Sequence, residues 1–240
     1  MLALLASFIG GLIDAIAGGG GLIVLPSLLV IGLPPHIAVS CNKFSACLGT
    51  LVATLNFARS KLILWKLALV GLPFSLFGAY LGTHLALTLS PSLFSKILVG
   101  LLPFAMLLTL IQPKLEDAKT KPKLVWMPII CVLIGCYDGF FGPATGSFLI
   151  LACYYVLKIN LLEASATAKV LNLASNASST LTFIAAGTVW WALAAPMAVA
   201  SILGNFIGSK LAIKLGSKIV RRFLLISLSL LLVTLIYKFI

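Results

Sequence analysis

The sequence predicts an all-α integral membrane protein made of two inverted-topology repeats, each with a short Gly-broken helical hairpin and three transmembrane helices. The first observation behind this prediction is composition: 61% of the 240 residues are hydrophobic and 9% are charged, against roughly half and about a quarter in soluble domains. Too few polar residues remain to cover a soluble surface, so lipid must cover it. The other two observations are an internal repeat and an uneven distribution of basic residues.

Ten apolar runs follow one another along the chain, separated by Gly, Pro or charged residues. A spanning helix needs about 20 mostly apolar residues, so the chain holds at most about ten membrane segments. The polar stretch 112–123 divides the runs into two groups of five, which predicts a first repeat at 1–111, a linker at 112–123 and a second repeat at 124–240. The runs lie at 2–17, 22–33, 44–58, 64–89 and 93–111, and at 124–141, 146–157, 170–187, 188–212 and 223–240.

Residues of the first group recur in the second group at a nearly constant distance. The distance is 124 residues up to residue 18 and 126 residues from residue 38, so a two-residue shift in one short loop explains the change. Asp is scarce in this chain, yet two of its three copies fall at equivalent places. The clearest matches pair Gly11 with Gly135, Asp14 with Asp138, Gly18 with Gly142, Lys43 with Lys169, Phe57 with Phe183, Gly78 with Gly204, and Gly82 with Gly208.

Basic residues predict that equivalent loops of the two halves face opposite sides of the membrane. Three of them crowd the gap between the third and fourth runs, whereas the equivalent gap near 187–191 carries no charge. The next gap shows the reverse pattern. The gap between the third and fourth runs holds Arg59, Lys61 and Lys66 in the first half. The next gap holds Lys96 in the first half, and the matching stretch of the second half holds Lys210, Lys214, Lys218, Arg221 and Arg222. By the positive-inside rule, the repeats are inverted, the linker and the basic loops are cytoplasmic, and both termini are outside.

This topology requires each half to cross the membrane an odd number of times. The second run of each half has about twelve residues, which as a helix span only roughly 18 Å of a roughly 30 Å hydrocarbon core. A re-entrant hairpin followed by three full helices satisfies both conditions, and a short tilted hairpin that crosses twice also fits. Re-entrant backbone is tolerated only where protein buries it or where it lines a cavity, so such a hairpin would mark the transport pathway.

The candidate substrate-binding residues lie at the two hairpin breaks and just after the second run of each half. Glycine breaks expose backbone amides before a helix N-terminus, which favours an anion, although the close packing of a tight turn also explains them. Two symmetric lysines near the midplane would attract the same anion, although snorkelling toward the interface also explains them. The candidates are Gly18, Gly19, Gly20, Gly21, Asn42, Lys43, Gly142, Pro143, Gly146, Lys169, Asn172 and Asn176.

Asp14 and Asp138 are the candidates for coupling or gating, because each lies one turn before a glycine break within an apolar run. A carboxylate inside the membrane is costly and marks a functional position by default. Each aspartate could carry a proton or orient the broken loop, and an Asp that only caps the free amides of the loop fits as well. Asn56 and Asn205 could also bond an anion, or serve helix packing.

Several function classes are disfavoured by what the sequence contains. The net charge of +12 is spread over short gaps between apolar runs, so nucleic acid is not an expected partner. Enzyme motifs such as HExxH, GxSxG and the Walker loop do not occur, and the five cysteines lack zinc-site spacing, so we expect no enzyme, no cofactor and no metal site. A secondary transporter of a small anion and a non-transporting membrane partner remain as alternatives.

The motifs GGLIDAIAGGGGLIVLPSLL, AVSCNK, CYDGFFGPATGSF and ATAKVLNLASN resemble the TauE/SafE family of sulfite and organosulfonate exporters, also called the toluene sulfonate uptake permease family. The resemblance covers nearly the whole chain. It implies a multi-pass protein of a bacterial-type inner membrane that moves sulfur-containing or carboxylate anions with an ion gradient. Two residues depart from the pattern: Cys41 stands where Thr is common, and Ala144 where a second Gly is common. The expected partners are therefore the anion and the bilayer, and a homo-oligomer stays possible.

Overall fold

A computed structural model describes residues 1–98, 100, 124–156, 158–220 and 222–223. Every regular element within these ranges is a helix, as the sequence predicts. The predicted linker lies outside the described residues, and so does most of the third predicted crossing of each half. The division of the chain into two repeats and a linker therefore stays a prediction.

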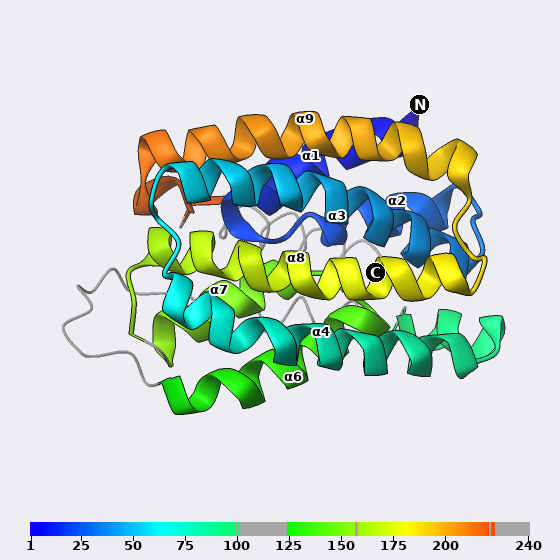
Figure 1. The fold of residues 1–240 in the computed structure, drawn as a ribbon. Helices are drawn as coiled ribbons and strands as arrows, with labels where there is room; N and C mark the ends of the chain where they lie inside the picture. Colours follow the sequence, from blue (N-terminus) through cyan, green and yellow to red (C-terminus); the bar gives the residue numbers. More distant parts are fainter. Residues whose placement is uncertain (99, 101–123, 157, 221, 224–240) are drawn as a thin grey trace.

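Four long helices lie side by side and form the frame of the molecule (Figure 1). They are α3 (Pro35–Arg59), α4 (Trp65–Thr88), α8 (Leu161–Ala185) and α9 (Trp191–Leu215), with 24 or 25 residues each. At 1.5 Å per residue such helices are about 36–38 Å long, enough to cross a hydrocarbon core of about 30 Å. By length and composition, α3, α4 and α9 are apolar enough to cross a membrane.

Helix α8 is as long as its neighbours but more polar, and its position explains why. Asn160 precedes it and accepts a hydrogen bond from the Glu163 amide at 2.9 Å, which caps the first turn. Further along, Ser165, Thr167 and Ser175 are fully buried. The helix packs against α3, α4 and α7, so its hydroxyl groups bond to protein and not to lipid.

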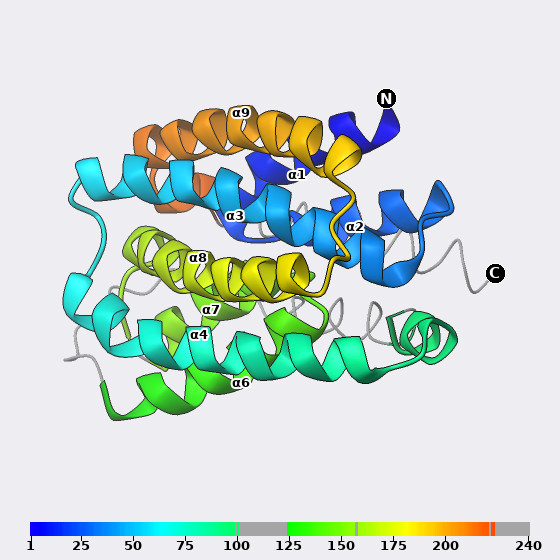
Figure 2. The same cartoon turned by 45° about the vertical axis from the view of Figure 1, so that its right-hand side comes forward.

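Two short helical hairpins enter this frame from opposite ends (Figures 1 and 2). The first consists of α1 (Leu2–Ala17) and α2 (Gly21–Val30). The second consists of α6 (Met127–Phe140), which follows the short 3-10 helix η1 (Leu124–Trp126), and of α7 (Thr145–Tyr155). Both breaks fall where the glycines predict them. Re-entry into a bilayer would need this opposed arrangement of short hairpins, and their depth in the membrane stays a prediction.

The tips of the two hairpins touch each other in the middle of the molecule. Gly18 ends α1 with a φ of +76°, and a Cβ at this position would overlap the backbone of Gly146. The Ser147 amide donates to the Gly18 carbonyl oxygen at 3.2 Å, and the Ser147 hydroxyl donates to the Ala17 carbonyl oxygen at 2.7 Å. Gly18 and Gly146 are therefore required for this close approach, which supports the packing interpretation of the breaks.

The first helix of each hairpin packs on a long helix of the other half. Helix α1 lies against α9, and α6 lies against α4. At both crossings a pair of glycines with GxxxG spacing faces the partner backbone so closely that a Cβ would overlap its carbonyl oxygens. These glycines are Gly78 and Gly82 on α4 and Gly204 and Gly208 on α9, the two pairs that the repeat matches to each other.

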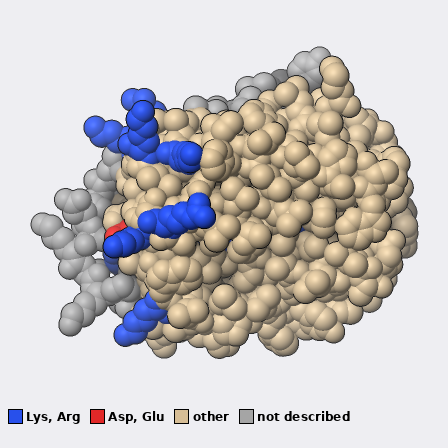
Figure 3. Space-filling model, turned by 45° about the horizontal axis from the view of Figure 1, so that its top comes forward, with Lys and Arg blue, Asp and Glu red and all other residues tan. Residues whose placement is uncertain are grey.

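Two pairs of equivalent turns share a left-handed backbone but differ in residue type. Lys158 (φ 58°) corresponds to Gly32 (φ 85°), and Lys61 (φ 58°) corresponds to Gly187 (φ 67°). A residue with a Cβ loses about 1–2 kcal/mol in this conformation. In Figure 1 the turn between α3 and α4, which holds Lys61, and the turn between α7 and α8, which holds Lys158, lie at one end of the molecule. Figure 3 shows that Lys and Arg gather at this end. The turns have therefore kept their shape while the charge differs between the two ends.

Candidate functional site

Two buried ion pairs lie in the middle of the molecule, and each joins the two halves. Lys43 Nζ on α3 is 2.6 Å from Asp138 Oδ1 on α6. Lys169 Nζ on α8 is 2.9 Å from Asp14 Oδ2 on α1. The side chains of Lys43 and Asp138 are 2% and 1% exposed. Those of Lys169 and Asp14 are 0% and 15% exposed. Because each buried charge has a partner of opposite sign, the cost of removing it from water is offset.

The repeat explains why these four residues meet. Lys43 and Lys169 occupy equivalent positions on long helices, and Asp14 and Asp138 occupy equivalent positions in the last turn before a hairpin tip. Each lysine is therefore matched with the aspartate of the other half. The sequence indicates that these residues share a site, but it does not indicate this pairing, which cancels the charge that the lysines would otherwise offer to an anion.

Thr50 and Asn176 occupy equivalent positions next to the two ion pairs, but one bonds to an aspartate and the other to a lysine. The Thr50 hydroxyl donates to Asp14 Oδ2 over a long 3.5 Å. Asn176 Oδ1 accepts from Lys43 Nζ at 3.2 Å. The additional bond thus goes to the carboxylate in one pair and to the ammonium group in the other. Among the described residues, nothing bonds to Asp138 Oδ2, which is buried.

A cavity of about 30 Å³ lies beside Lys43, with room for about two water molecules. Both hairpins and helices α3, α8 and α9 contribute to its lining. Of the predicted site residues, Gly19, Pro143 and Lys169 do not line it. The predicted residues that do are Asp14, Gly18, Gly20, Gly21, Asn42, Lys43, Asp138, Gly142, Gly146, Asn172 and Asn176.

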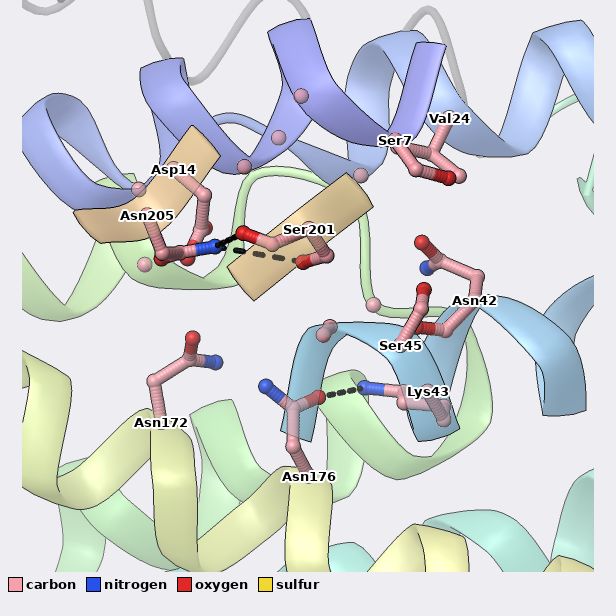
Figure 4. A pocket seen from close by; sticks show the side chains of 18 of the residues that line it. Ser7, Asp14, Val24, Asn42, Lys43, Ser45, Asn172, Asn176, Ser201 and Asn205 are labelled. Carbon is pink, nitrogen blue, oxygen red and sulfur yellow. Dashed lines mark hydrogen bonds between the residues drawn. The ribbon is translucent and has the colours of Figure 1, made fainter. Parts of the chain in front are cut away.

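The side chains around the cavity offer hydrogen-bond donors to a small ligand (Figure 4). Asn42 and Lys43 extend from α3, and Asn172 and Asn176 extend from α8. The described residues give the side-chain amides of Asn42 and Asn172 no hydrogen bond, so both are available to a ligand. Asn205 on α9 also lines the cavity, but its Nδ2 donates to its own helix at 3.0 Å.

The tip of the first hairpin adds backbone donors. Gly20 and Gly21 line the cavity, and α2 begins at Gly21. No described residue provides a backbone acceptor for the amides of Gly19, Gly20 and Gly21. At the second tip the Thr145 amide donates to the Gly142 carbonyl oxygen at 3.3 Å. Free amides at a helix N-terminus attract anions, so the first tip is the stronger candidate of the two.

Apolar side chains close the molecule on both sides of this polar centre. One buried cluster includes Phe57 and Leu67, near the turn between α3 and α4. The other includes Ala38, near the first residue of α3, and Phe183, near the last residue of α8. The polar cavity therefore lies between two clusters of buried apolar residues.

Sequence reasoning missed four polar residues near the site: Ser7, Ser45 and Ser201, which line the cavity, and Thr50, which bonds Asp14. The repeat register could have identified Thr50, because it matches Asn176 at a distance of 126 residues. Asn56 was an open candidate, and its Nδ2 donates to Ser209 Oγ at 2.8 Å, which is a helix contact. Within the described part of the chain, no group of three His, Cys, Asp or Glu side chains could hold a metal ion.

Comparison with known proteins agrees with this architecture. The model of the family "Sulfite exporter TauE/SafE" matches residues 3–235. The chain belongs to this family. It is 38% identical over 226 residues to a probable membrane transporter protein of Haemophilus influenzae, covering 92% of this chain and 89% of that protein. It is 36% identical over 223 residues to the probable membrane transporter protein YfcA of Escherichia coli K12, covering 92% and 83%. No solved structure matches.

Family membership confirms the resemblance that the motifs indicate. It also confirms that the chain is a membrane transporter and not an enzyme. A transporter has a small-molecule substrate and a lipid environment.

Proposed function

We propose that this chain is a secondary transporter that moves a small anion of the sulfite, sulfonate or carboxylate class across a bacterial inner membrane by alternating access, driven by an ion gradient. The observation that carries the proposal is the buried ammonium group of Lys43 beside a small polar cavity at the contact of two broken hairpins. Intramembrane charges and helix breaks of this kind characterise the sites of secondary transporters.

The donors around the cavity suit an oxyanion. Sulfite, sulfonate and carboxylate groups present two or three oxygen atoms that accept hydrogen bonds. Lys43, the amides of Asn42 and Asn172, and the backbone amides of Gly20 and Gly21 provide donors from three directions. Charge-assisted bonds to an ammonium group are the strongest of these. An anion would therefore be held in a site that offers a neutral solute fewer favourable contacts.

The small volume of the cavity and the contact between the tips support alternating access. The cavity has room for about two water molecules, whereas sulfite has four heavy atoms. The tips must separate to admit the anion, and Gly18 and Gly146 lie where they touch. Because the hairpins enter from opposite ends, moving one of them would open the cavity toward one end of the molecule only.

The basic end of the molecule is proposed to be cytoplasmic. Lys61 and Lys158 occupy left-handed turns at this end, where the equivalent turns at the other end use glycine. A lysine is unfavourable in a left-handed turn, so its presence there supports the proposal that its charge sets the orientation of the protein in the membrane. Single cysteines replacing Lys61 and Ala186, in a background without the native cysteines, should react with an impermeant thiol reagent from opposite sides. Labelling from the same side would contradict the inverted arrangement.

Flux through proteoliposomes tests the proposed function. The wild-type protein should transport at least one of sulfite, sulfoacetate and taurine, and Lys43→Ala and Lys169→Ala should each abolish that flux. Lys61→Ala is the matched control, because it removes a lysine that is exposed at the basic end, and it should retain flux. Unchanged flux in both Lys43→Ala and Lys169→Ala would exclude the proposed site.

A further inference from the structure

The two ion pairs have unequal roles in the transport cycle, which we infer from their surroundings. We propose that a proton neutralises Asp138 and that the substrate anion then takes the place of this carboxylate on Lys43, while the pair of Asp14 and Lys169 stays closed. This inference rests on the proposed function and adds to it the residue that takes the proton and the residue that binds the anion.

Access to the cavity separates the two lysines. Lys43 and Asp138 both line the cavity, so an anion that enters it meets this pair directly. Asp14 also lines the cavity, but Lys169 does not. An anion would therefore meet the carboxylate of the second pair and not its ammonium group. Among the two pairs, only the Lys43 pair presents its ammonium group to the cavity, where an anion can replace the carboxylate.

The two carboxylates also differ in their hydrogen bonds. Asp14 Oδ2 accepts from Lys169 Nζ at 2.9 Å and from Thr50 Oγ1 at 3.5 Å. Asp138 Oδ2 is buried and has no partner among the described residues. A proton can bind at this free oxygen without displacing a donor, because Lys43 occupies the other oxygen, Oδ1. Asp138 is thus the carboxylate that has a position open for a proton.

The two lysines differ in the hydrogen-bond acceptors that they keep when their ion pair opens. Lys43 Nζ also donates to Asn176 Oδ1 at 3.2 Å, so it keeps one acceptor while it exchanges Asp138 for the anion. Asp14 is the acceptor that the structure gives to Lys169. Opening this second pair would leave a fully buried ammonium group without a partner, which is strongly unfavourable. The exchange is therefore easier at Lys43.

The charges balance through the cycle. The four side chains of the two pairs sum to zero; one proton bound to Asp138 Oδ2 makes the sum positive by one, and one monoanion on Lys43 returns it to zero. Proton and anion therefore enter and leave in the same direction, one for one. Other titratable groups that face the pair are Asp14 on α1, Cys47 on α3 and Tyr137 on α6. Helices α4 and α7 place no titratable side chain in the lining.

The first test measures how pH affects anion binding by the purified full-length protein. Methanesulfonate is the probe, because its sulfonate group stays ionised throughout the pH series, so that any linked proton is bound by the protein. Above the pH at which the free protein takes up the proton, the affinity of the wild-type protein should fall about tenfold per pH unit, as linkage to one proton requires. Asp138→Asn should bind with no such dependence, and Asp14→Asn should keep it. A slope that Asp138→Asn retains, or that only Asp14→Asn loses, would overturn the proposal.

Matched double variants keep the proposal testable if a single variant fails to fold. Replacing both partners of a buried pair leaves no unpaired charge, so both doubles should fold. Lys43→Gln with Asp138→Asn should weaken binding of methanesulfonate and of sulfite by about tenfold or more, because a charge-assisted bond is lost. Lys169→Gln with Asp14→Asn should weaken binding less, and it should keep the pH dependence that the first double variant loses. Equal loss in the two doubles would overturn the assignment.

The outcomes separate this inference from the proposed function. Wild-type protein that binds no small anion at any pH would refute the proposed function, and the assignment with it. Wild-type protein that binds anions with no pH dependence would overturn the proton exchange at Asp138 and leave the proposed transporter standing.

Discussion

The two ion pairs have the same residues at equivalent positions, but their environments differ. Lys43 with Asp138 lies at the cavity, and the additional bond from Asn176 goes to the lysine. In the pair of Asp14 and Lys169, the lysine lies away from the cavity and the additional bond goes to the carboxylate. The two ion pairs therefore occupy symmetric positions. They differ in the neighbouring residue, which is Asn176 beside Lys43 and Thr50 beside Asp14, and this difference accompanies the difference in how the two pairs can act.

The largest expected effect on stability comes from removing one lysine of a pair. Lys43→Met should lower the free energy of unfolding by about 3–5 kcal/mol, because it leaves Asp138 buried without its ion-pair partner. Lys169→Met should cost less, since Asp14 is 15% exposed to the cavity and keeps its contact with Thr50. Denaturant unfolding in detergent measures both values. Equal losses would show that the surroundings of the two pairs are energetically the same.

The two hairpin tips should differ in their tolerance of a Cβ. Gly18 and Gly142 both have positive φ angles, of +76° and +93°. A Cβ at Gly18 would overlap backbone of Gly146, whereas a Cβ at Gly142 would lie 2.9 Å from the Lys43 ammonium group, which is the end of a flexible side chain. Gly18→Ala should therefore cost about 2–4 kcal/mol, from the backbone conformation and the overlap together.

Gly142→Ala should cost only about 1–2 kcal/mol of unfolding free energy, because the end of the lysine can shift. It should nevertheless weaken anion binding, since Lys43 would lie in a different place. The two alanine variants are compared by thermal unfolding and by binding of sulfite. A larger stability loss in Gly142→Ala than in Gly18→Ala would contradict the contact that the structure places between the tips.

The helix crossings should show the symmetry that the ion pairs lack. Gly78 on α4 faces the backbone of Val132, and Gly204 on α9 faces the backbone of Phe8 in the equivalent way. Gly78→Ala and Gly204→Ala should each cost about 1–3 kcal/mol of unfolding free energy, by similar amounts, because a close backbone contact must widen. A clear difference between them in the same unfolding assay would mean that the frame has diverged as well as the site.

Local features of the fold could be read from the sequence because they depend on residue type and spacing. Glycine runs predicted the break at Gly18, and the basic gaps predicted that Lys and Arg gather at one end of the molecule, as Figure 3 shows. The pairing of Lys43 with Asp138 could not be read, because residues of different halves meet only through tertiary packing, which includes the crossings of α1 on α9, of α6 on α4 and of α3 on α8. The same limit applies to Lys169, whose position behind the cavity depends on how α8 is rotated about its axis.

A final difference between the tips concerns Ala144, which has a φ of +64° where its equivalent Gly20 has a φ of −57°. Ala144→Gly would relieve about 1–2 kcal/mol of backbone strain and lose about 0.8 kcal/mol from a buried methyl group. The net gain in unfolding free energy should be small, at most about 1 kcal/mol.

Gly20→Ala is the matched variant in the first hairpin, and it should destabilise, because its Cβ would lie 2.7 Å from the Asp14 Cβ. Thermal unfolding of both variants in detergent makes the comparison. A loss of stability in Ala144→Gly would mean that the methyl group holds the second tip in place. The alanine would then stabilise the tip against its own backbone strain, and the two hairpins would differ in packing as well as in their hydrogen bonds.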